Sequence, residues 1–287
     1  MRRAVWLILS SAVGWLPPAS APQSPFTTSN NTVPIFATAL QGGALVTDLG
    51  PEEFEILDNG KLQHMTVFEA GRQAITIAVM LDDSASMQAM QPTARRAALA
   101  LVDALGPADR ATIGGFSRSV RIHGDLTQDR ARLTEWLAVT PPLMAGTALW
   151  DAINAGISAL DGEPGRRVVL VISDGADNGS GADRAAVVAD AVRTGVMVSA
   201  ITFKTGDRSN RDLRDCAAAT GGSFSELKSG QPLDGVLRRI VDELRSQYLL
   251  GFSPSRLDGT THALAVRAKR RGVSVRARSS YFSGPLK

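Results

Sequence analysis

The pattern of apolar residues divides the chain into a central region with long apolar runs and two flanks with shorter alternation. In the central region, nearly unbroken apolar runs are followed by amphipathic segments. Such runs are typical of strands buried on both faces of a parallel sheet, and the segments between them are typical of crossover helices. The pattern predicts an α/β fold with a doubly wound, mainly parallel sheet. Strands are expected at 74–82, 111–117, 119–124, 166–174, 196–203 and 223–227, and helices at 92–105, 128–138, 147–160, 182–194, 209–219 and 233–246.

Both flanks show the alternation of half-buried strands. Residues 32–71 and 247–287 contain short segments in which apolar and polar residues alternate, as in strands with one solvated face. We expect the two flanks to pack together as one small β-domain, with the α/β domain (72–246) inserted between them.

Turn signals predict two hairpins within the flanks. Asn59-Gly60 favours a tight turn between two strands. The ribbon that this turn predicts has four apolar residues on one face: Phe54, Ile56, Met65 and Val67. A second hairpin is expected around Arg271-Gly272, between the segments HALAVRAKR and GVSVRARSSYF.

The first 23 residues resemble a targeting segment. Arg2 and Arg3 precede an apolar run from Ala4 to Leu16, and small residues follow, which is the layout of a signal peptide. The run is shorter than the roughly 20 residues that span a bilayer. We therefore expect export to the periplasm or the medium and a mature chain without a transmembrane span, the alternative being an N-terminal membrane anchor. Residues 24–31 read as a polar linker.

Charge and cysteine content exclude several classes of partner and cofactor. The 31 basic and 28 acidic residues give a net charge of +3. Loss of Arg2 and Arg3 with the leader reduces it to +1, so the balance gives no argument for a nucleic-acid partner. Cys216 is the single cysteine, which excludes an intrachain disulfide and a zinc site made of thiolates. We expect it to be a small buried apolar residue.

The C-terminal flank is locally basic, with no acidic residue after Asp258. Anionic lipid, polysaccharide and nucleic acid are alternative partners for such a stretch. No aromatic residues interleave for stacking, and the preferred interpretation is the solvated face of a hairpin. The basic residues concerned are Arg267, Lys269, Arg270, Arg271, Arg276 and Arg278.

Oxygen-bearing side chains follow the two most apolar strands. Asp82, Ser84 and Ser86 come at the end of the first, and Asp174 ends the second. Open α/β sheets bind ligands at the carboxyl ends of their strands, and hard cations take oxygen ligands. Thr147 brings a further hydroxyl to a helix start. The first loop alone is equally consistent with ordinary turn and helix-capping residues.

Taken together, these motifs resemble a known family. The set DxSxS at 82–86, GTALWDA at 146–152 and ISDG at 172–175 resembles the metal-ion-dependent adhesion site of von Willebrand factor A-type (VWA) domains. The resemblance covers residues 74–246 and implies their Rossmann-like fold. The stretches 49–60 and 247–252 resemble the flanks of secreted bacterial VWFA-related proteins.

The resemblance implies a magnesium or manganese site and a protein ligand. The partner would offer an Asp or Glu carboxylate to the metal, because only two site carboxylates face the ion and leave it electrophilic. The implied function is an extracytoplasmic, non-enzymatic binding or adhesion module. The implied metal ligands are Asp82, Ser84, Ser86, Thr147 and Asp174.

Other interpretations concern the function and the neighbouring residues. An envelope-assembly scaffold would use the same site in a permanent complex. A metal-dependent hydrolase is disfavoured, because Ser84 stands where a phosphatase of the haloacid dehalogenase type has its second Asp and no nucleophile elbow or P-loop is present. Asp83 is expected to be a solvated loop carboxylate. Asp177 and Asn178 are expected to support the site or to form a turn.

Overall fold

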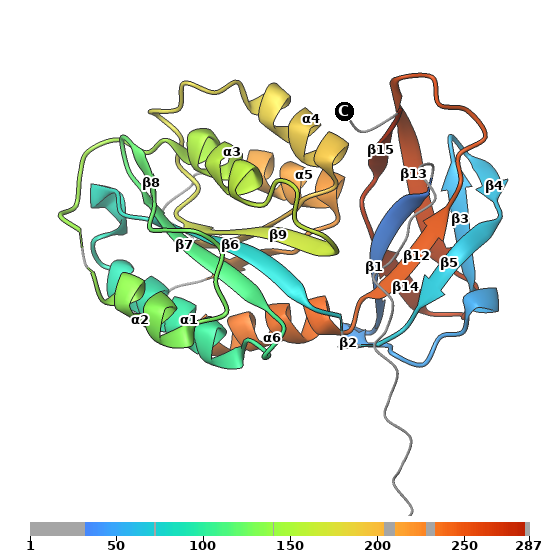
Figure 1. The fold of residues 1–287 in the computed structure, drawn as a ribbon, viewed down its shortest axis with the longest axis horizontal. Coiled ribbons are helices and arrows are strands. Elements are labelled where there is room, and N and C mark those ends of the chain that lie inside the picture. The colour runs from blue at the N-terminus through green and yellow to red at the C-terminus, as the bar shows by residue number, and fades with distance from the viewer. Residues whose placement is uncertain (1–31, 72, 140, 204–209, 228–232, 285–287) are drawn as a thin grey trace, which may run out of the picture.

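The computed structural model describes residues 32–284 except 72, 140, 204–209 and 228–232, and it shows two regions side by side (Figure 1). The α/β region contains a six-stranded sheet in the order β11-β10-β9-β6-β7-β8, with all neighbours parallel except β8. This confirms the predicted doubly wound, mainly parallel sheet. Its strands are β6 (Ile75–Asp82), β7 (Arg110–Phe116), β8 (Val120–Ile122), β9 (Arg166–Ser173), β10 (Met197–Phe203) and β11 (Phe224–Leu227).

Helices cover both faces of this sheet (Figure 1). They are α1 (Gln91–Ala104), α2 (Arg130–Ala138), α3 (Leu149–Ala159), α4 (Arg184–Thr194), α5 (Arg211–Thr220) and α6 (Leu233–Arg245), with a 3-10 turn, η2 (Ala85–Met87), after β6. Helices α1, α2 and α6 pack on one face, and α3, α4 and α5 on the other. Every residue of β6 is buried, as its unbroken apolar run predicts.

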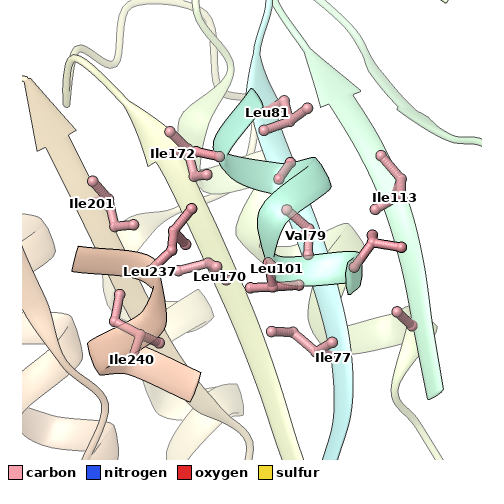
Figure 2. Close-up of a cluster of buried hydrophobic side chains, with 14 of the residues drawn as sticks. Ile77, Val79, Leu81, Leu101, Ile113, Leu170, Ile172, Ile201, Leu237 and Ile240 are labelled. Atoms are coloured by element: carbon pink, nitrogen blue, oxygen red, sulfur yellow. The ribbon is translucent and has the colours of Figure 1, made fainter. Parts of the chain in front are cut away.

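Alternate residues of the central strands supply each layer of the core. Ile77, Val79 and Leu81 of β6 lie on the face that α1 covers with Leu101, and on the same face Leu237 and Ile240 of α6 lie beside Leu170 and Ile201 (Figure 2). The intervening residues of the strand face the opposite helices. Helices cover both faces of the sheet and exclude water from them. The ends of the strands therefore reach solvent at the carboxyl edge of the sheet.

The two flanks pack together in one small β region, as expected, and this region is a β-sandwich. Strand β1 pairs with β12 from Val33↔Phe252 to Ala37↔Tyr248, and β3 pairs with β13. One sheet has the order β14-β1-β12-β5 with β2 beside β1, and the other has the order β15-β13-β3-β4. The strands are β1 (Val33–Gln41), β2 (Ala44–Leu45), β3 (Phe54–Asp58), β4 (Lys61–Gln63), β5 (Met65–Glu69), β12 (Tyr248–Phe252), β13 (Thr260–Ala268), β14 (Val273–Arg276) and β15 (Ser280–Ser283), and a 3-10 turn, η1, spans Pro51–Glu53.

The predicted ribbon of β3 with 65–67 is wrong. The turn at Asn59-Gly60 forms, but it joins β3 to the short strand β4. The chain then leaves this sheet at His64, and β5 pairs with β12 in the other sheet. Crossing over brings Phe68 of β5 against Phe54 of β3 inside the sandwich, with ring centroids 6.1 Å apart. Packing of the aromatic side chains between the two sheets therefore stabilises the fold more than a longer local hairpin would.

The predicted hairpin around Arg271-Gly272 is also wrong. The chain does turn there, but β14 pairs with β1, and β13 pairs with β3 and β15. The basic residues of this stretch are not all solvated either. Arg270 forms ion pairs with Asp48 and Glu53, and Arg276 forms one with Glu243 of α6 at 2.5 Å.

The sandwich packs against the amino ends of the sheet strands. Arg166, at the start of β9, is fully buried with its guanidinium carbon 5.0 Å from the ring centre of Phe36. Its Nη2 donates to the carbonyl of Gln247 (3.4 Å), and Nε2 of Gln247 donates to Thr38 (3.2 Å). These contacts join the end of the α/β region to β1.

Two further expectations can be compared with the structure. Cys216 is buried in α5, and burial raises the pKa of its thiol to about 12, so it is the inert small residue that was expected. Within the described residues, no helix is long and apolar enough to cross a membrane. The predicted signal peptide (1–23) and linker (24–31) lie outside the described residues.

Candidate functional site

Asp82 is the last residue of β6 and is buried, with 1% of its surface exposed. Its Oδ1 accepts a hydrogen bond from the Ser84 backbone (2.9 Å), and its Oδ2 accepts one from the Ser173 hydroxyl (2.5 Å). Burial raises the pKa of Asp82, these hydrogen bonds lower it, and the neighbouring Asp174 carboxylate raises it further. The carboxylate is therefore held in one orientation beside a second acidic group.

Ser84 and Ser86 lie at the start of the loop that follows. Their hydroxyl oxygens are 3.0 Å apart. Ser84 is buried and Ser86 is exposed, so the pair leads from the interior of the site to its surface. The Ala85 backbone donates to the carbonyl of Met144 (3.0 Å), which ties this loop to the segment that carries Thr147.

Thr147 immediately precedes the N-cap of α3 and is 2% exposed. Its backbone N–H donates to Oδ1 of Asn178 (2.8 Å), and the Asn178 N–H donates to its carbonyl (3.0 Å). Oδ1 of Asp177 accepts from the Leu149 N–H in the first turn of α3 (3.1 Å). Asp177 and Asn178 therefore join the loop after β9 to the loop that carries Thr147.

Asp174 follows β9 and is 1% exposed. Its Oδ1 accepts from the Ala176 N–H (3.0 Å). The next residue, Gly175, has a φ of +80°, and a Cβ there would lie 1.9 Å from Oδ1 of Asn210. Only glycine fits this turn, which explains the glycine of the ISDG motif.

Asp83 differs from the expectation of a solvated carboxylate. It is 2% exposed, and its Oδ1 accepts hydrogen bonds from Arg95 and Gln91 of α1, both at 3.0 Å. Its Oδ2 lies 3.9 Å from Arg121. Successive residues of a strand point to opposite faces, so Asp83 turns toward α1 while Asp82 turns toward Ser173. Asp83 is a structural ion-pair residue.

Sequence reasoning missed Ser173, whereas the support that Asp177 and Asn178 give to the loop of Thr147 is one of the two roles expected for them. Ser173 is fully buried and donates to Asp82. Its position at the end of a fully apolar strand, one residue before Asp174, was a signal, because a polar residue there must find a partner.

Asp82 ends β6, and the other four predicted ligand residues lie in the segments that follow β6 and β9 or precede α3, at the carboxyl edge of the sheet. Only oxygen atoms are offered, and two carboxylates, Asp82 and Asp174, lie close enough to repel each other. Among the described residues, no group of three or more His, Cys, Asp or Glu could hold a metal ion, so a cation at this edge would depend on the hydroxyl oxygens as well as on the two carboxylates. The donor set fits a hard divalent cation.

Comparisons with solved structures show similar folds at low identity. A VWA protein from Catenulispora acidiphila has a TM-score of 0.56 at 14% identity, covering 89% of this chain and 74% of that one. An aerotolerance-related membrane protein from Bacteroides fragilis has a TM-score of 0.51 at 20% identity, covering 60% and 98%. Proximal thread matrix protein 1 from the mussel byssus, with a zinc-occupied MIDAS motif, has a TM-score of 0.52 at 20% identity, covering 66% and 50%.

A comparison with curated proteins finds no match. The family model of the von Willebrand factor type A domain matches residues 76–238. This range holds more than half of the chain, and it runs from the second residue of β6 past β11, with every loop of the site inside it. The chain therefore belongs to the von Willebrand factor type A domain family.

Proposed function

We propose that this protein is an extracytoplasmic, metal-dependent module that binds a carboxylate of a protein partner at the carboxyl edge of its sheet. VWA domains are generally non-enzymatic and typically bind protein ligands. The observation that carries the proposal is the placement of two buried carboxylates and three hydroxyls on linked loops at one edge. The residues that would hold the cation are Asp82, Ser84, Ser86, Thr147 and Asp174.

The chemistry of the site supports Mg²⁺ or Mn²⁺. Hydroxyl ligands add no charge, so Asp82 and Asp174 neutralise a divalent ion without any further anion. A bound Mg²⁺ retains water and supplies a position that an incoming Asp or Glu carboxylate can take. The protein supplies the rest: Ser173 and the Ser84 backbone orient Asp82, and Asn178 holds the loop of Thr147.

Export is part of the proposal and rests on the sequence of residues 1–23. Two arginines, an apolar run and small residues form the layout of a signal peptide. The single cysteine means that an exported chain depends on its packed core and not on an intrachain disulfide.

The test is thermal unfolding with Mg²⁺, Mn²⁺ or EDTA. We expect either metal to raise the melting temperature of the wild type, because a ligand that binds only the folded state stabilises it. Asp82→Asn and Ser86→Ala should weaken or abolish the shift, and Ser86 is exposed, so its loss should leave the fold intact. Ser119→Ala, at an exposed serine between β7 and β8, is the matched control. A metal shift that survives Asp82→Asn would overturn the assignment.

A further inference from the structure

A second candidate site lies at the opposite end of the α/β region. A cavity of about 490 Å³ opens between the amino ends of β9 and β10, the end of α4 and the sandwich strands β1 and β15. This volume is typical of ligand pockets, which occur preferentially at domain interfaces. The cavity shares no residue with the carboxyl-edge site.

Two arginines from different regions line the cavity. Arg167 belongs to β9, and Arg278 lies between β14 and β15. A Cβ added to Gly195 would lie 3.4 Å from Nη1 of Arg278 and 3.8 Å from Nη2 of Arg167. The two guanidinium groups therefore flank the same point, the left-handed C-cap of α4.

Neither guanidinium has an ion-pair partner among the described residues. Arg278 donates to the carbonyl of Pro34 (2.6 Å), and Arg167 donates to the carbonyl of Thr194. The Nε of each is buried without a hydrogen-bond partner. Asp161 acts on Arg167 only as a nearby charge. Burial and the neighbouring Arg167 lower the pKa of Arg278 to about 10, although Tyr281 acts to raise it. Arginine side chains stay protonated in proteins at neutral pH, so both groups are cationic.

A third arginine at the cavity provides a contrast. Arg193 also lines it, but its guanidinium forms an ion pair with Asp190 on the same helix. Positive charge at Arg193 is therefore neutralised, whereas the positive charge at Arg167 and Arg278 is not. Two facing cations in a partly dry cavity repel each other, and an anion between them would remove that cost.

The rest of the lining is largely apolar. Val33 and Pro34 come from β1, Met197 from β10, and Leu257, with 46% of its surface exposed, from the loop before β13. Guanidinium groups bind planar oxyanions through two parallel hydrogen bonds. We propose that this cavity binds a small organic anion, with its carboxylate or other oxyanion held between Arg167 and Arg278 and its apolar part against Pro34, Met197 and Leu257.

The test uses calorimetric titration of the full chain with three probes. Octanoate carries an oxyanion on an apolar chain, octan-1-ol carries the chain alone, and inorganic phosphate carries the charge alone. We expect saturable binding of octanoate and much weaker binding of octan-1-ol. Phosphate binding that depends on the same arginines would show that the charge suffices, and its absence would show that the apolar part is needed; either supports the proposal. The proposal is overturned if neither octanoate nor phosphate binds. It is also overturned if octanoate and octan-1-ol bind with equal affinity.

Variants locate the binding. Arg167→Gln and Arg278→Gln should each lower octanoate affinity by about tenfold or more, because each removes a charge-assisted hydrogen bond. Arg193→Gln is the matched control and should change it little. Circular dichroism checks the fold of each variant, and Arg278→Lys is a second variant that keeps the charge. The proposal is overturned if octanoate binds wild type, Arg167→Gln and Arg278→Gln with equal affinity. If a variant fails to fold, the comparison of octanoate with octan-1-ol in the wild type still tests the proposal.

Discussion

The α/β region and the sandwich both bury apolar side chains, but they draw these side chains from different parts of the chain. The α/β region uses one central stretch, whereas the sandwich combines the two flanks. The α/β sheet is built from one continuous stretch of chain, and its most distant paired residues, such as Ile75 and Arg166, are 91 apart in sequence. The sandwich joins residues more than 200 apart in sequence, such as Ala37 with Tyr248. Because long-range pairing must overcome loop-closure entropy, we expect the sandwich core to close after the inserted domain has brought the two chain ends together.

The largest expected effect is loss of the aromatic centre of the sandwich. Tyr248 is 1% exposed, its ring lies 5.0 Å from that of Phe54, and its hydroxyl bonds the backbone of Val46 and Leu49. Tyr248→Ala should lower the free energy of unfolding by about 3–5 kcal/mol. Urea denaturation measures the loss, and hydrogen exchange should show it first in β1 and β12.

Tyr248→Phe is the control for this variant, since it keeps the ring and removes only two hydrogen bonds, at about 1 kcal/mol each. If Tyr248→Ala exposes the amides of β6 and β9 as much as those of β1, the two regions unfold as one unit and the comparison drawn above fails.

The corresponding test in the α/β region is the buried ion pair of Asp83. Asp83→Ala leaves Arg95, whose side chain is 12% exposed, without its carboxylate. Removing one partner of a buried ion pair should lower the free energy of unfolding by about 3 kcal/mol. Amide hydrogen exchange should become faster in β6 and α1 but not in the sandwich. Arg121→Ala, at the exposed end of the same cluster, should cost less than about 1 kcal/mol. Similar losses for both variants would contradict the assignment of Asp83 as a structural residue.

A smaller effect is expected at the helix beside the cavity. The Asp183 side chain caps α4 by accepting from the Ala186 N–H at 2.9 Å. Asp183→Ala should lower the free energy of unfolding by about 1 kcal/mol, measured by urea denaturation. Asp183→Ser, which can still cap, should restore most of it. No recovery in the serine variant would show that the charge matters and not the cap.

The smallest effect should depend on pH and be confined to the sandwich. His262 is 7% exposed and faces Asp58, Asp258 and Tyr281, its Nδ1 lying 2.8 Å from Asp58. Burial lowers the pKa of His262, but the hydrogen bonds to the two aspartates outweigh it, and the pKa is raised above its ordinary value of 6.5.

The direction of this pH dependence follows from the coupling between protonation of His262 and folding. A raised pKa means that the folded state binds the proton more tightly, so the stabilisation is complete below pH 6.5 and is lost as pH rises through the raised value. The melting temperature of the sandwich should therefore fall across that window. His262→Gln should flatten this dependence, and His64→Gln should not. An unchanged slope in His262→Gln would assign the dependence to other groups.

The sequence by itself determined the α/β region and its candidate site. Strand β6 is recognisable because burial on both faces demands an unbroken apolar run. Asp82 and Asp174 could be placed at one edge because parallel strands all end there. Local periodicity also revealed the strands of the flanks.

Only the tertiary structure decided which strands pair and where the charges go. Strand β5 crosses to the other sheet because Phe68 gains burial against Phe54. Asp83 is buried because α1 brings Arg95 to it. Arg278 reads as one more basic residue of a solvated hairpin, yet it meets Arg167 across a cavity between two regions. Contacts between distant segments depend on how whole elements pack, and no local pattern in the sequence carries that information.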